Sequence, residues 1–217
     1  MAIRLSSHAK LIHFASSDGH RLEGRLTPGA ADRAVVLCHP HPLYGGSMLT
    51  PVIMTAEQAF QEAGYTTLAF NFRGVGGSQG TYGEGRAEVD DVTGALSFLR
   101  ETLGGTPRVQ AVAGYSFGSF VGGVAARSAP GVGFYLGIAP PLNHYDFGFL
   151  KAALFPIALV AGKRDEFCEA SRLETLYLSL PATPWLRLLE TDHFFTEALS
   201  DLAQACRDAI AWAVTGG

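Results

Sequence analysis

Three side-chain types in this chain could together carry out nucleophilic catalysis: a serine, a carboxylic acid and a histidine. A serine hydroxyl is a poor nucleophile at neutral pH, so it needs a histidine to accept its proton and an acid to orient that histidine. Ser116 stands between Gly114 and Gly118 in Gly-Tyr-Ser-Phe-Gly. A serine in a sharp strand-to-helix turn needs small neighbours, because a Cβ at either glycine would meet the crossing backbone. The motif therefore predicts a nucleophile elbow with Ser116 as the nucleophile.

Partners for Ser116 follow two predicted strands further along the chain. Asp165 comes after the strand predicted at residues 156–161, and His193 comes after the one predicted at residues 185–189. In an open parallel sheet, ligands bind beyond the carboxyl ends of the strands, so residues at these positions can meet. We therefore predict that His193 is the base and that Asp165 orients it.

Other acids and histidines compete for these two roles. Glu166 adjoins Asp165 and is the reserve acid, or else an exposed carboxylate near the start of a helix. Asp192 would have to fold back onto the next residue, so we expect it to form hydrogen bonds within its loop. His144 lies in an irregular segment without an acid partner at a strand end.

Two further loops could suggest a metal or a cofactor. The loop at residues 39–47 has the sequence His-Pro-His-Pro-Leu-Tyr-Gly-Gly-Ser, in which two prolines and two glycines exclude regular structure. His39 and His41 have a His-x-His spacing, but no further Asp or His ligand for zinc follows closely. The loop at residues 71–78 is not a dinucleotide-binding fingerprint, because Gln79 stands where a third glycine is needed. We therefore expect neither a metal ion nor an organic cofactor.

Short apolar segments alternate with amphipathic segments along the chain. Residues 10–15 and 20–27 flank a Ser-Ser-Asp-Gly turn and predict an antiparallel hairpin at the edge of a sheet. Further strands are predicted at residues 33–38, 66–70, 109–114, 132–138, 156–161 and 185–189, and helices at residues 48–63, 86–103, 117–129, 168–178 and from Leu199 to Ala213. This alternation predicts an α/β fold with a mostly parallel central sheet and helices on both faces.

Length and composition limit the possible functions. The 217 residues fit a single domain, which we expect to span residues 1–217. The net charge of -4 and the scattered basic residues argue against nucleic acid as a partner. Neither a signal peptide nor a membrane span is predicted, because no apolar run is long enough, and we expect a cytoplasmic protein without a membrane partner. Three cysteines without a Cys-x-x-Cys pair are expected to be buried apolar residues.

These motifs together resemble those of the α/β-hydrolase fold family. The elbow around Ser116 and the order Ser116, Asp165, His193 match the family, and residues 71–78, Asn-Phe-Arg-Gly-Val-Gly-Gly-Ser, are similar to its Arg-Gly-x-Gly-x-Ser loop. The His-Pro-His-Pro-Leu-Tyr-Gly-Gly loop resembles that of small, cap-less bacterial serine hydrolases distantly similar to dienelactone hydrolase. Dienelactone hydrolase has cysteine in the elbow, so Ser116 argues against lactone specificity.

The resemblance implies a serine hydrolase that cleaves a small-molecule acyl ester or thioester through an acyl-enzyme. Its oxyanion hole would use the backbone N–H of Phe117 and a second N–H from residues 39–46. Leu43 is the preferred second donor, and His41 is the alternative. A non-catalytic ligand-binding module on the same fold, or a small peptidase or lactonase, is the alternative function.

The resemblance also bears on access to the site. Lids in this family are commonly inserted after the sixth strand, here residues 132–138, but only residues 139–155 separate that strand from the next. A transverse helix with its two connections needs roughly 20 or more residues. We therefore expect no cap domain, an open and shallow cleft, and a preference for acyl groups of about two to six carbons.

Overall fold

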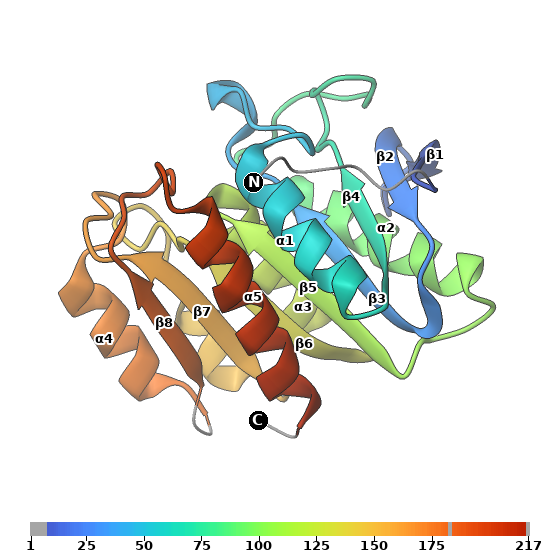
Figure 1. Ribbon diagram of the computed structural model, residues 1–217. Helices are drawn as coiled ribbons and strands as arrows, with labels where there is room; N and C mark the ends of the chain where they lie inside the picture. Colours follow the sequence, from blue (N-terminus) through green and yellow to red (C-terminus); the bar gives the residue numbers. More distant parts are fainter. Residues whose placement is uncertain (1–7, 182–183, 216–217) are drawn as a thin grey trace.

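A sheet with helices on both faces runs through the molecule (Figure 1). In the part of the chain that the computed structural model describes, residues 8–181 and 184–215, eight strands form this sheet in the order β1-β2-β4-β3-β5-β6-β7-β8. The strands are β1 (Lys10–Ala15), β2 (Arg21–Thr27), β3 (Ala30–Cys38), β4 (Tyr65–Phe70), β5 (Val109–Tyr115), β6 (Val132–Ile138), β7 (Ile157–Gly162) and β8 (Trp185–Leu189).

The sheet combines an antiparallel edge with a parallel centre. β1 pairs with β2, and β2 with β4, in antiparallel register, which confirms the predicted N-terminal hairpin at the sheet edge. From β4 to β8 every neighbouring pair of strands is parallel. All residues of β4 and β7 are buried, as expected for parallel strands that helices cover on both faces.

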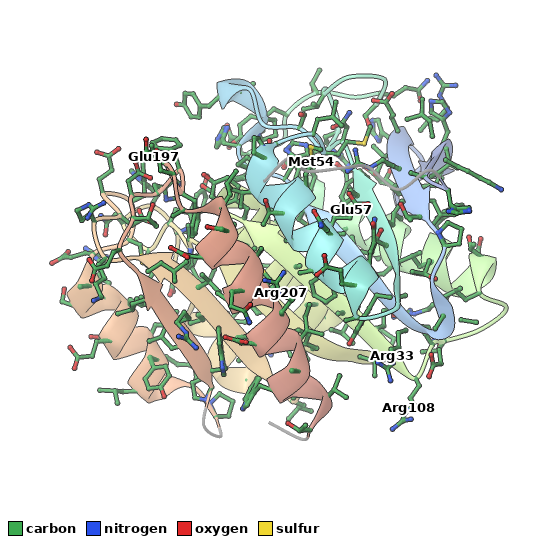
Figure 2. All side chains as sticks on the ribbon, viewed as in Figure 1. Arg33, Met54, Glu57, Arg108, Glu197 and Arg207 are labelled. Atoms are coloured by element: carbon green, nitrogen blue, oxygen red, sulfur yellow. The ribbon has the colours of Figure 1, made fainter. Side chains whose placement is uncertain are left out.

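Five helices cover the two faces of the sheet in the described residues, and their bounds are α1 (Pro51–Glu62), α2 (Glu88–Thr102), α3 (Phe117–Ser128), α4 (Ala170–Ser179) and α5 (Leu199–Val214). α1 and α5 lie side by side on one face, where they share a buried apolar cluster (Figure 1). Arg207 of α5, labelled in Figure 2, forms an ion pair with Glu62 of α1 in which nitrogen and oxygen are 3.3 Å apart. α2, α3 and α4 pack against the other face and share a second apolar cluster.

The first helix begins later than its apolar pattern indicates. The prediction placed it at residues 48–63, whereas α1 begins at Pro51 with Thr50 as its N-cap residue. Proline suits the first position of a helix because it has no N–H to leave unpaired and its φ is already helical.

The cysteines and the lengths of the helices test two further predictions from the sequence. Cys38, Cys168 and Cys206 are free and buried, in agreement with their prediction as small apolar residues. Burial raises the pKa of the Cys168 and Cys206 thiols to about 12, so both are protonated at neutral pH. No helix within residues 8–181 and 184–215 is long and apolar enough to cross a bilayer.

Candidate active site

Ser116 occupies a strained turn between β5 and α3. Its φ is +54° and its ψ is −123°, a conformation that residues with a Cβ rarely adopt. The Ser116 N–H donates to the carbonyl of Ile138 at 2.9 Å and helps to hold the turn. A Cβ at Gly114 would lie 2.2 Å from the carbonyl oxygen of Gly118, and a Cβ at Gly118 would lie 2.2 Å from that of Cys38. Both glycines are therefore required by the close approach of α3 to β5 and β3.

The loops after three strands bring Ser116, His193 and Asp165 into one hydrogen-bonded row. Ser116 Oγ is 2.9 Å from His193 Nε2, and His193 Nδ1 is 2.8 and 2.9 Å from the two carboxylate oxygens of Asp165. The histidine and the aspartate are 4% and 7% exposed. A carboxylate only accepts, so Nδ1 carries the imidazole proton and Nε2 is left to accept the serine proton. This geometry is suited to activating a hydroxyl group.

Two aromatic residues that the sequence analysis did not select hold this row in place. The Phe167 N–H donates to Asp165 Oδ1 at 2.8 Å, and the Phe167 ring lies 4.6 Å from the His193 ring. The Tyr115 hydroxyl donates to the carbonyl of His193 at 3.1 Å. Tyr115 directly precedes Ser116, and Phe167 is two positions after Asp165. This proximity in the sequence was the signal that could have identified both residues.

Glu166 and Asp192, the two alternatives to Asp165, do not contact the His193 ring nitrogens. Glu166 is exposed, in a loop that ends before α4 begins, so it is not a first-turn residue of that helix. Asp192 Oδ1 accepts the N–H groups of Phe194 and Thr196 at 3.1 and 3.0 Å, which is the loop role expected for it. Hydrogen bonds from Thr196 are the main cause that lowers the pKa of Asp192.

Two residues of the site have a backbone N–H without a protein acceptor in the described part of the chain. Among the described residues, neither Phe117, the first residue of α3, nor His41 donates its backbone N–H to the protein. The rings of His41 and Phe117 are 4.9 Å apart, and both residues line one cavity with Ser116. The preferred Leu43 does not fit this geometry. Its N–H donates to His41 Nδ1 at 3.2 Å, and Leu43 is 66% exposed.

His39 has a structural role at the ends of β3 and β4. Its Nε2 accepts the Phe72 N–H at 3.0 Å, and its Nδ1 lies 2.6 Å from the Pro40 carbonyl oxygen, to which it donates. Burial lowers the pKa of His39 to about 4, so the ring is neutral at pH 7. Both ring nitrogens are engaged and unavailable to a metal ion. In the described parts of the chain, no three His, Cys, Asp or Glu side chains are grouped to hold one.

The row opens onto a cavity of about 710 Å³. Its walls come from the loops after β3, β5, β6, β7 and β8, and the aromatic residues among them are Tyr44, Tyr115, Phe117, Tyr145, Phe167 and Phe194. From the sequence we expect an open and shallow cleft. The observed cavity has aromatic walls, because single aromatic residues from separate loops converge on it.

Comparison with known proteins identifies the family. The sequence model of the Alpha/beta hydrolase family matches residues 35–216. The chain belongs to the alpha/beta hydrolase family. The hydrolase is 32% identical over 210 residues to an uncharacterized protein of Rickettsia prowazekii (strain Madrid E), an alignment that covers 91% of this chain and 87% of that protein.

Two solved structures share the whole fold of the hydrolase. A protein of unknown function from Agrobacterium tumefaciens has a TM-score of 0.89 and 30% sequence identity, covering 95% of this chain and 97% of that one. A serine hydrolase without lid from Xanthomonas campestris has a TM-score of 0.83 and 28% identity, covering 96% and 97%. The predicted lidless α/β-hydrolase fold is confirmed. Between β6 and β7 the hydrolase has only the short 3-10 helix η2 (Gly148–Ala152).

Proposed function

We propose that this hydrolase cleaves a small ester or thioester through an acyl-enzyme, with Ser116 as nucleophile, His193 as base and Asp165 as the acid that orients it. The observation that carries the proposal is the continuous hydrogen-bonded row from Ser116 Oγ through His193 to Asp165. The strained turn at Ser116 supports it further, because such strain is maintained where function needs an exposed side chain.

The first half of the reaction forms the acyl-enzyme. Ser116 Oγ bonds to the carbonyl carbon of the substrate while its proton passes to His193 Nε2, and the Asp165 carboxylate stabilises the resulting imidazolium. When the tetrahedral intermediate collapses, the bond from carbon to the leaving oxygen or sulfur breaks, and the leaving group takes the proton from Nε2. In the second half, water replaces Ser116 as the attacking group and the same proton transfers release the acid.

The developing oxyanion needs two donors, and we assign the backbone N–H groups of Phe117 and His41. This replaces the preference for Leu43, whose N–H is engaged by the His41 ring. The Gly118 backbone lies against the carbonyls of Cys38 and His39, so the start of α3 and the loop after β3 are close enough to act together. Removing one oxyanion donor in comparable enzymes costs about 2.7–4 kcal/mol of transition-state stabilisation.

A substrate panel tests this function. We would assay p-nitrophenyl acyl esters and acyl-CoA thioesters with the wild type, Ser116→Ala and Ser97→Ala, the last being an exposed serine on α2. We expect turnover of at least one class by the wild type and Ser97→Ala, and a loss of about 10⁶-fold in kcat for Ser116→Ala. Turnover that survives Ser116→Ala would show that the hydrolysis uses another group.

A further inference from the structure

The His41 side chain begins a second hydrogen-bonded row that the proposed chemistry does not use. Its Nδ1 accepts the Leu43 N–H at 3.2 Å, and its Nε2 lies 3.1 Å from the Tyr82 hydroxyl oxygen. A backbone amide can only donate, so Nδ1 is unprotonated. Burial lowers the pKa of His41, which favours the neutral ring. The single ring proton therefore lies on Nε2, and His41 donates it to Tyr82.

Tyr82 accepts a hydrogen bond from His41 and can therefore donate its own proton to Tyr145. Since the Tyr82 oxygen accepts from His41, its own proton is available to the neighbouring Tyr145 hydroxyl. Burial is the main cause that raises the pKa of both tyrosines, that of Tyr82 to about 12. The two tyrosine side chains interact with each other, and the direction follows from His41, which donates to Tyr82. Tyr145 then accepts from Tyr82 and keeps its own proton for another acceptor.

Contacts with two phenylalanine rings fix the position of the Tyr145 side chain. The Tyr145 ring stacks on Phe120 with centroids 4.5 Å apart and meets the edge of Phe117 at 6.1 Å. Tyr145 lines the 710 Å³ cavity together with Ser116. Among the described residues, Tyr82 is the hydrogen-bond partner of the Tyr145 hydroxyl, and because Tyr82 donates, the Tyr145 proton is left for another acceptor. The row therefore ends on a hydroxyl donor in the wall of the cavity that holds the nucleophile.

We propose that the Tyr145 hydroxyl binds an oxygen of the substrate, so that the hydrolase prefers esters that carry a second acceptor oxygen, such as an ether, a hydroxyl or a ketone. This inference rests on the proposed function. Tyr145 is the specificity residue, while His41 and Tyr82 are positioning residues that leave its proton without a protein acceptor. A site that presents a donor rejects an analogue without the acceptor, because the donor then stays unpaired.

The test combines one enzyme variant with matched pairs of substrates. Tyr145→Phe and the wild type would be assayed on p-nitrophenyl butanoate against p-nitrophenyl methoxyacetate, which differ by one oxygen in the acyl part. The second pair, butyl acetate against 2-methoxyethyl acetate, places the oxygen in the alcohol part. Comparing variant with wild type on each substrate cancels the intrinsic reactivity of the ester.

We expect Tyr145→Phe to lower kcat/KM for the oxygen-containing member of at least one pair about five- to tenfold more than for its hydrocarbon partner. Tyr82→Phe should reduce this difference, because it frees the Tyr145 proton to rotate. Tyr177→Phe, a half-buried tyrosine on α4 away from the cavity lining, should leave all ratios unchanged. Equal effects of Tyr145→Phe on both members of both pairs would overturn the inference.

Failure of this inference can be distinguished from failure of the proposed function. Labelling of Ser116 by a fluorophosphonate reports the nucleophile and needs no second oxygen in the substrate. If the wild type is labelled and cleaves the hydrocarbon esters while Tyr145→Phe gives equal ratios, only the role of Tyr145 fails. If the wild type is not labelled and cleaves none of the four esters, the proposed function fails, and the role of Tyr145 with it.

Discussion

At the scale of single residues, Asp165 and Glu166 show how burial distinguishes two adjacent carboxylates. Asp165 is 7% exposed and contacts His193 Nδ1 through both oxygens, whereas Glu166 is exposed to solvent. A carboxylate removed from water interacts more strongly with an imidazolium than one that solvent screens. The two neighbours therefore differ in the catalytic consequence of neutralising them.

Replacing Asp165 with asparagine tests this difference. We expect Asp165→Asn to lower kcat by about 10⁴-fold, because the amide favours the wrong tautomer of His193. Glu166→Gln is the matched control and should change kcat less than about twofold. Both are measured on the best ester from the substrate panel. A mild Asp165→Asn beside a damaging Glu166→Gln would mean that the acid is Glu166.

His39 predicts how stability depends on pH. Its pKa is lowered to about 4 in the folded protein, from the 6.5 that it has in the unfolded chain. As the pH falls below 6.5, the unfolded chain binds the proton first, so the free energy of unfolding decreases until about pH 4. The full loss from this residue is about 3 kcal/mol.

The variant His39→Gln isolates this contribution, because the glutamine oxygen can accept the Phe72 N–H without a charge change. Urea unfolding between pH 7.5 and pH 4.5 measures the effect. We expect the wild type to lose about 2 kcal/mol more than His39→Gln over that range. Parallel curves for the two proteins would show that His39 does not titrate in this way.

At the scale of elements, the packing of α3 against β3 positions both proposed oxyanion donors. The Gly118 Cα lies so close to this strand end that an added Cβ would be 2.2 Å from the Cys38 carbonyl oxygen and 2.4 Å from that of His39. Backbone atoms cannot rotate away as side chains can. The start of the helix or the loop would have to move.

Gly118→Ala is therefore expected to destabilise the protein by about 2–3 kcal/mol. It should also lower kcat, because the Phe117 and His41 N–H groups would move apart. Gly133→Ala, where nothing lies within 4 Å of the added Cβ, should stay within about 0.5 kcal/mol of the wild type. Thermal unfolding and kcat measure the two effects. A Gly118→Ala variant as stable and active as Gly133→Ala would contradict this account of the elbow.

The elements themselves could be predicted because their patterns are local. Strands β1, β6 and β8 have the predicted bounds, and the other elements differ from theirs by a few residues at one or both ends. The choice between Leu43 and His41 could not be made from the sequence. It depends on a hydrogen bond from the Leu43 N–H to the His41 ring, which forms in the 3-10 turn η1 (Pro42–Tyr44). No residue pattern in the sequence predicts that hydrogen bond.

Side chains that meet from distant segments were equally hidden from the sequence. Tyr82 and Tyr145 are 63 positions apart and meet only because the loops after β4 and β6 lie over the start of α3. Ser116, Asp165 and His193 are also distant in sequence, but each follows a strand of one parallel sheet. The topology therefore predicted their meeting, whereas the tyrosines belong to loops whose paths only the folded chain shows.

At the scale of the whole molecule, loops at the carboxyl ends of five strands form the cavity, and the connection between β6 and β7 borders it without a cap. Tyr44 and Phe194, which line the cavity, are 86% and 59% exposed. An apolar chain longer than the cavity would therefore extend into water, where further methylenes add no burial. Each buried methylene contributes about 0.8 kcal/mol, so the gain with chain length should stop where burial stops.

We expect kcat/KM on p-nitrophenyl esters to rise within acyl groups of about two to six carbons and then level off or fall. The rate should show no jump when substrate micelles or lipid droplets form. A chain-length series and a substrate titration through the solubility limit measure both properties. Rates that keep rising to twelve or sixteen carbons would reveal a longer apolar channel.

Covalent labelling by a fluorophosphonate, followed by intact mass and peptide mapping, shows directly whether Ser116 is an activated nucleophile. The phosphorus reagent reacts with a serine only where a base accepts the hydroxyl proton, as His193 is positioned to do for Ser116. We predict one label per chain on Ser116, none on Ser116→Ala and much slower labelling of Asp165→Asn. Labelling that persists at the same rate in Ser116→Ala, or maps to another residue, would show that Ser116 is not the nucleophile.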